Sequence, residues 1–102
     1  MDNNGFQITP DTLRAQAHTA REAGFTQLAE NFERAAELSR VPSAELLRMY
    51  EVLRPGRSTQ AELLAVADAL EQQHQAPITA RFVREAAAVY LERGLFRKPP
   101  GV

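Results

Sequence analysis

Helix-starting and helix-ending residues divide this chain into five segments of helical character. Thr9 followed by Pro10 is typical of a helix N-terminus, because the threonine hydroxyl can accept a first-turn N–H and proline needs no N–H there. The strongest break is the Arg-Pro-Gly-Arg run at 54–57, after which Thr59 and Glu62 have the spacing of a capping box. The predicted helices cover residues 10–23, 26–40 and 44–53, a fourth stretch after Thr59, and a fifth from Pro77 to Gly94.

The other boundaries are predicted from single residues that favour helix ends. Gly24 and Gly94 stand where a left-handed residue is favoured after the last helical turn. Thr26 and Ser43 each carry a hydroxyl that can cap the helix after it. Because only the segment 24–26 joins the first two helices, we expect these helices to be antiparallel neighbours.

Apolar residues recur at helical spacing in each segment. In the third segment they cover more than half of the circumference, so this helix is either central to the domain or covered by another chain. The residues predicted to face the core are Leu13, Ala17 and Ala20 in the first helix, Leu28, Phe32, Ala35 and Ala36 in the second, Leu63, Val66, Ala67 and Leu70 in the fourth, and Ile78, Phe82, Ala86, Val89 and Tyr90 in the fifth.

No alternating run of β-branched residues bounded by turn signals occurs, so no sheet is predicted. We therefore predict an all-α fold, a compact bundle of about five short-to-medium helices. A chain of 102 residues is enough for one domain. We place that domain over residues 8–97, with a flexible N-terminus at 1–7 and a disordered tail at 98–102.

Charge and composition argue against several classes of function. Twelve Lys and Arg against thirteen Asp and Glu give a net charge of −1, which is too weak a field to attract nucleic acid or an acidic membrane. The absence of cysteine removes disulfides, thiolate nucleophiles and Cys-ligated zinc, and suits a reducing compartment. No run approaches the roughly 18 apolar residues of a membrane span, and no secretory signal pattern is present. We expect a cytoplasmic protein with no nucleic-acid or membrane partner.

The residues that could carry chemistry do not form a recognisable active site. His18 and His74 stand apart, without further ligands at metal-binding spacing, and we interpret them as solvent-facing or capping. Ser39, Ser43 and Ser58 lie at helix boundaries, where capping accounts for them. No glycine-rich phosphate-binding pattern occurs. We predict no catalytic, cofactor-binding or metal-binding residue on this chain.

A partner-binding surface is the function that the residues favour instead. Met49 and Tyr50 lie on the highly apolar third helix, and aromatic, Met and Arg side chains are enriched in interface cores. Arg54 and Arg57 flank a Pro-Gly turn and could anchor a partner's carboxylates or helix end. Equally, these arginines could cap the end of the third helix. Met49, Tyr50, Arg54 and Arg57 are our predicted partner contacts.

Several strings of the sequence, taken together and in order, resemble one protein family. They are 8–14 (ITPDTLR), 31–38 (NFERAAEL), 53–55 (LRP), 57–59 (RST), 62–65 (ELLA) and 82–87 (FVREAA). Collinear from Ile8 to about Arg93, they resemble the small subunit of adenosylcobalamin-dependent diol and glycerol dehydratases.

The resemblance implies a helical subunit of a three-subunit carbon–oxygen lyase, a dimer of heterotrimers that dehydrates 1,2-propanediol or glycerol to an aldehyde by radical chemistry. It implies that the large subunit, a TIM-type barrel, holds substrate and metal ion, and that adenosylcobalamin lies between the large and medium subunits. The small subunit would pack on the large one and supply no catalytic residue. Family members usually carry a substantial N-terminal extension, whereas residues 1–7 alone precede the matching block here. Because such an extension could clasp the large subunit or direct the enzyme to a bacterial microcompartment, we expect the docking role in the helical body and a location in the cytoplasm, with the microcompartment as the alternative.

Two other functions stay open at this point. A free-standing helical module that no longer serves a dehydratase would self-associate, for example as a homodimer in isolation. A small independent enzyme would show activity as the lone chain. For the core, we expect Phe32→Ala to cost about 3 to 5 kcal/mol if the ring fills the space between the first two helices.

Overall fold

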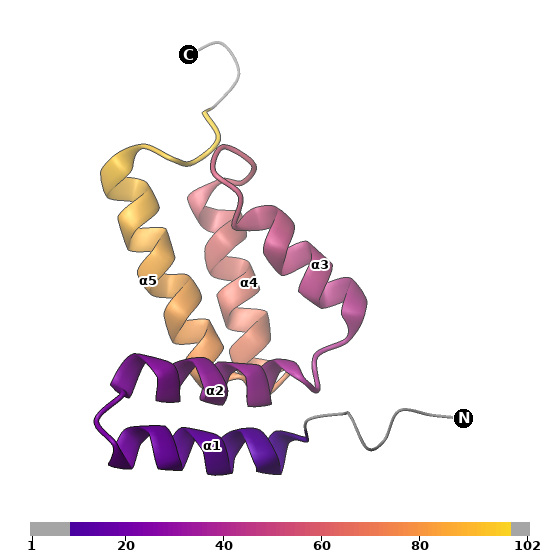
Figure 1. The fold of residues 1–102 in the computed structure, drawn as a ribbon. Coiled ribbons are helices and arrows are strands. Elements are labelled where there is room, and N and C mark those ends of the chain that lie inside the picture. The colour runs from indigo at the N-terminus through magenta and orange to yellow at the C-terminus, as the bar shows by residue number, and fades with distance from the viewer. Residues whose placement is uncertain (1–8, 99–102) are drawn as a thin grey trace. The chain divides into compact units, whose positions relative to one another are not determined.

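The computed structural model describes residues 9–98, which form five α-helices joined by short turns (Figure 1). The helices are α1 (Pro10–Glu22), α2 (Thr26–Leu38), α3 (Ser43–Val52), α4 (Gln60–Gln72) and α5 (Pro77–Arg93). Residues 9–98 contain no strand, which confirms the predicted all-α class. The predicted flexible segment 1–7, and the predicted tail apart from Lys98, lie outside the described residues.

The helices fall into two compact units. The first unit ends at Arg40 and contains α1 and α2. The second begins at Val41 and contains α3, α4 and α5. The single domain that we predict over residues 8–97 stays a prediction.

In the first unit, α1 begins as predicted and lies side by side with α2 (Figure 1). Thr9 Oγ1 accepts a hydrogen bond from the Thr12 N–H at 3.2 Å, which satisfies one donor of the first turn. Gly24 follows the end of α1 with φ of +87°, the left-handed conformation predicted for it. The buried face of α1 is also the predicted one: Leu13, Ala17 and Ala20.

The buried residues of α2 are Ala29, Ala36 and Glu37, so the prediction for this helix is partly wrong. Ala29 and Ala36 are buried, and Phe32 is half-buried against Ala29 and the alanines of α1. The predicted Leu28 and Ala35 are exposed. Since the facing surface of α1 is also small, the two helices pack closely, and the larger leucine is turned away from the contact.

Two predicted N-caps are wrong because each is itself the first residue of the helix that it was expected to cap. Thr26 and Ser43 are the first helical residues, and the N-caps are Phe25 and Pro42, which make no side-chain cap bond. Each N-cap carbonyl accepts the N–H four residues further along, at 3.0 Å. Pro42 suits this position because its backbone is extended (φ −58°, ψ 147°) and an N-cap needs no N–H of its own.

In the second unit, α4 and α5 lie side by side (Figure 1). The predicted capping box is present: Thr59 Oγ1 accepts the Glu62 N–H at 3.2 Å, and the Glu62 carboxylate accepts the Thr59 N–H at 2.9 Å. Arg84 of α5 forms ion pairs with Asp68 (2.8 Å) and Glu71 (2.7 Å) of α4. The buried face of α4 is the predicted set: Leu63, Val66, Ala67 and Leu70.

The buried face of α5 differs from the predicted one. Phe82 and Val89 were expected inside but are 42% and 43% exposed. The prediction follows the larger apolar residues, whereas close packing of two helices favours small side chains at the contact. Gly94 ends the helix in the left-handed conformation (φ +67°), as predicted. The residues of α5 that are buried are Thr79, Ala80, Val83 and Ala87.

Candidate docking surface

Helix α3 has one side packed within its own unit and one side exposed. Met49 is buried, with 4% of its surface exposed, whereas Leu47 and Tyr50 are 69% and 56% exposed. Leu47 and Tyr50 occupy positions i and i+3 of the helix, so they share one face. Arg54 follows the C-cap residue Leu53. The outer face therefore presents an aliphatic and an aromatic side chain beside a cation. The Met49 side chain is packed inside the chain, and a partner contact through it stays a prediction.

The two predicted anchor arginines converge on one carboxylate. Arg54 Nη1 lies 3.4 Å from Glu51 Oε1, and Arg57 Nη1 lies 3.6 Å from Glu51 Oε2. Both arginine side chains are more than half exposed. Residues 54–57, named the arginine turn from this point, thus hold two guanidinium groups at the surface on either side of Glu51.

Other side chains cap the end of α3. Ser58 is buried, and its hydroxyl donates a 2.6 Å hydrogen bond to the Val52 carbonyl. The Tyr90 hydroxyl donates to the Leu53 carbonyl, and its ring meets Phe96 edge to face, with centroids 5.8 Å apart. Capping of α3 was one of the two roles predicted for the arginines. In the structure, Ser58 and Tyr90 bond the carbonyls at this helix end. The boundary position of Ser58 indicated a capping role, but nothing in the local pattern indicated Tyr90.

The segment 94–98, which follows α5, is bonded to the arginine turn. The Gly56 N–H donates to the Leu95 carbonyl at 2.8 Å, and the Arg97 N–H donates to the Ser58 carbonyl at 2.7 Å. Arg97 Nη1 also donates to the Arg57 carbonyl at 3.3 Å. Gly56 has φ of +80°, a conformation that favours glycine. These bonds brace the backbone that carries the two exposed arginines.

Two titratable groups of the second unit are shifted by structural contacts. The Thr59 N–H bonded to its carboxylate, together with Arg97 at 3.3 Å, lowers the pKa of Glu62. Hydrogen bonds to Asp68 and to a second α4 carboxylate raise the pKa of Arg84. Both shifts stabilise the charged form of the group. Glu62 belongs to the capping box of α4, and Arg84 pairs α5 with α4, so the shifts arise from helix capping and helix packing.

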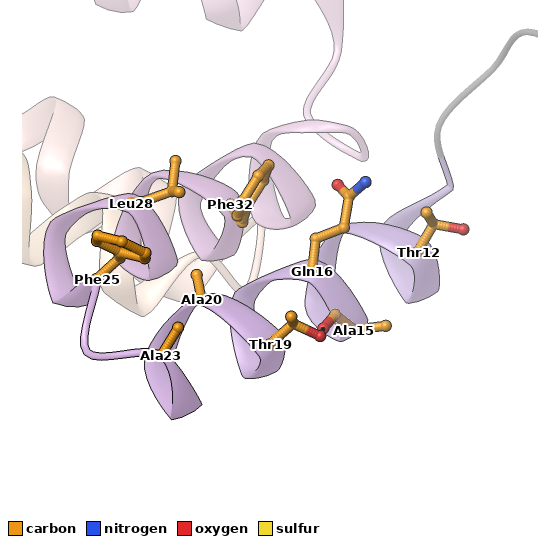
Figure 2. A pocket seen from close by; sticks show the side chains of 9 residues that line it. All are labelled: Thr12, Ala15, Gln16, Thr19, Ala20, Ala23, Phe25, Leu28 and Phe32. Carbon is orange, nitrogen blue, oxygen red and sulfur yellow. Dashed lines mark hydrogen bonds between the residues drawn. The ribbon is translucent and has the colours of Figure 1, made fainter.

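The first unit carries an open groove of about 450 Å³ along α1 and α2 (Figure 2). Phe25 and Leu28 line it with much of their surface exposed, and Phe32 forms part of its wall. The prediction missed this groove because it placed Leu28 and Phe32 in the core. The lining residues are uncharged: Thr12, Ala15, Gln16, Thr19, Ala20, Ala23, Phe25, Leu28 and Phe32.

The two histidines are far apart in the sequence and differ in environment. His18 is exposed on α1, and His74 lies after α4 with its Nε2 buried and without a hydrogen-bond partner. Within residues 9–98, no three His, Asp or Glu side chains gather as possible metal ligands. None of the five described helices combines the length and apolar character of a membrane span.

The described residues thus present two apolar surface features, the outer face of α3 in the second unit and the groove along α1 and α2 in the first. A family model described as the dehydratase small subunit matches residues 1–97. The chain is 60% identical over 88 residues to the propanediol dehydratase small subunits of Citrobacter freundii and of Salmonella typhimurium, which is 86% of this chain and 51% of each relative. The chain belongs to the dehydratase small-subunit family, which confirms the resemblance seen in its sequence, and it spans about half the length of these relatives.

Proposed function

We propose that this chain is the small subunit of a diol dehydratase and that it works by binding the larger subunits of that enzyme. The observation that carries the proposal is the family match over residues 1–97, with 60% identity to two subunits that are named for propanediol dehydratase. The proposed complex eliminates water from 1,2-propanediol or glycerol and leaves an aldehyde. Because both relatives are propanediol enzymes, 1,2-propanediol is the substrate that we expect.

Within this complex, we assign the chain a structural role rather than a catalytic one. Its exposed α3 face and arginine turn combine Tyr, Leu and Arg, a composition suited to a protein interface. Two serines that could have been nucleophiles donate to backbone carbonyls instead: Ser58 to Val52 and Ser39 to Ala36, at 2.6 and 2.7 Å. We assign the exposed α3 face and the arginine turn to packing on the large subunit, which this chain would thereby stabilise.

The α1–α2 groove does not fit adenosylcobalamin, the cofactor expected for the complex. A corrinoid is far larger than a drug-sized ligand, and the α1–α2 groove is an open surface feature of about 450 Å³. Neither His18 nor His74 lines that groove, so no imidazole is directed into it. We therefore propose that the large and medium subunits bind the cofactor and that this chain contributes no group to it.

For the assembly we propose a dimer of heterotrimers, each with a large, a medium and a small chain. A cytoplasmic location, with or without association to a bacterial microcompartment, goes with this assembly. Cell fractionation in a host that expresses all three chains tests the location. Cofractionation of the small chain with the other two in the soluble or microcompartment fraction supports it, and recovery of the small chain with membranes contradicts it.

The proposed function is tested by co-expressing a tagged copy of this chain with dehydratase large and medium chains. We expect the three to co-elute at micromolar concentration, and only the complex supplied with adenosylcobalamin to form aldehyde from 1,2-propanediol. Elution of the tagged chain alone contradicts the proposal. A homodimer that does not bind the other chains supports a self-associating module, and aldehyde formation by the lone chain supports an independent enzyme.

A further inference from the structure

The arginine turn carries more positive charge than its own contacts neutralise. Two guanidinium groups, those of Arg54 and Arg57, share the one carboxylate of Glu51. The neighbouring Arg97 has its own partner in Glu62, at 3.3 Å. Within residues 9–98, one positive charge at the surface of the turn is therefore left without a counter-charge.

The same two arginines keep most of their hydrogen-bonding capacity. A guanidinium has five N–H donors in a planar fork. The contact from Arg54 to Glu51 is a long one at 3.4 Å, and that from Arg57, at 3.6 Å, is beyond hydrogen-bond distance. A second carboxylate could take up the remaining donors in a bidentate contact without displacing Glu51.

The backbone beneath the arginines is already fixed. Gly56 is bonded to Leu95, and Ser58 is bonded both to Val52 and to Arg97. A braced backbone reduces the conformational entropy lost when a partner binds, which favours affinity. Leu47 and Tyr50, on the adjoining outer face of α3, can exclude water around an ionic contact and so strengthen it.

From charge complementarity, we infer that Leu47, Tyr50, Arg54 and Arg57 form one docking surface for an acidic, apolar segment of the large dehydratase subunit. An Asp or Glu of that segment accepts hydrogen bonds from the two guanidiniums and neutralises the excess charge. Apolar side chains of the same segment cover Leu47 and Tyr50. The inference rests on the proposed function and deepens it by stating the chemistry of the partner segment.

The test compares binding of the full-length chain and its variants to a purified complex of large and medium subunits. The double variant Arg54→Glu/Arg57→Glu should bind about tenfold more weakly or worse, as expected for interface arginines. Arg48→Glu is the matched control, because Arg48 is exposed on the same helix but lies about 100° around from Leu47. It should bind like the wild type. Wild-type affinity should also fall with added salt, and the double variant should lose that dependence.

The outcomes separate this inference from the proposed function. If the wild-type chain binds the larger subunits and the double variant binds equally well, the acidic partner segment is excluded while the subunit role stands. If the wild-type chain does not bind them at all, the subunit role fails and the inference with it. If the double substitution instead breaks a homodimer and leaves subunit binding unchanged, a second copy of this chain covers the surface and the inference is wrong. Circular dichroism of the double variant should match the wild type, since both arginines are exposed.

Discussion

The buried hydroxyl of Ser58 donates a 2.6 Å hydrogen bond to the carbonyl of Val52, six residues earlier, and so closes the chain around the arginine turn. The bond satisfies one of the carbonyls that the end of α3 leaves without a helical partner. It also fixes the backbone of the connection between the end of α3 and the start of α4. The local geometry of the proposed docking surface depends on this pair.

Replacing Ser58 with alanine should lower the free energy of unfolding by about 1 to 3 kcal/mol, because the partly buried Val52 carbonyl would lose its bond. Urea denaturation followed by circular dichroism measures the change. Ser43→Ala is the matched control, since Ser43 is exposed and makes no cap bond, and it should change stability by less than about 0.5 kcal/mol. Equal effects of the two substitutions would show that the Ser58 bond does not stabilise the fold.

Replacing Gly56 with alanine should cost about 1 to 2 kcal/mol, because an L side chain is strained at φ of +80°. A Cβ at this position would meet no atom within 4 Å, so the cost comes from the backbone and not from a clash. Gly56→Asn should cost less, since asparagine tolerates the left-handed region. Thermal unfolding of both variants checks the order, and an alanine variant as stable as the wild type would contradict it.

The half-buried position of Phe32 revises the sequence-based expectation for its truncation. Phe32→Ala should cost about 2 kcal/mol, below the 3 to 5 kcal/mol of a fully buried ring, because one side of the ring lines the groove. The control Leu28→Ala, at an exposed position, should cost less than about 1 kcal/mol. Chemical denaturation measures both, and a loss as small for Phe32 as for Leu28 would remove the ring from the core of the first unit.

Stability should depend on the ionisation of Glu62. Its pKa is lowered in the folded chain, chiefly by the Thr59 N–H, so the unfolded chain binds a proton more readily. The stabilisation is present above the pKa of the unfolded state and is lost as pH falls through the folded pKa. Urea midpoints from about pH 6 to about pH 3 should fall more steeply for the wild type than for Glu62→Gln. Parallel curves would contradict a contribution from the capping box carboxylate.

The parts of the fold that could be predicted are those with a local physical signal. Thr59 and Glu62 stand at capping-box spacing, and Leu63 begins a stripe of residues that are both apolar and buried. The fifth helix has two apolar stripes, and the sequence gives no local sign that the smaller residues around Val83, rather than Phe82, face α4. Which stripe is buried depends on how closely two helices approach, a property of the pair rather than of either segment.

The candidate site was predictable to a similar extent. Tyr50, Arg54 and Arg57 are exposed as a contact surface requires, and Leu47 could have been added from its i, i+3 relation to Tyr50. The bracing of the turn depends on contacts between distant residues, such as Tyr90 with Leu53. The sequence pattern near the turn contains no trace of such long-range bonds.

We propose that this chain is a non-catalytic subunit held by larger dehydratase chains. Native mass spectrometry of the co-expressed and purified complex tests it most directly. We expect a single assembly that contains the small chain in equal number with the large and medium chains. The small chain should bind this assembly more weakly when Arg54 and Arg57 are both replaced by glutamate. Masses of the small chain alone, or of its homo-oligomer, beside an assembly of large and medium chains that never includes it, would show that this chain is not a subunit of that enzyme.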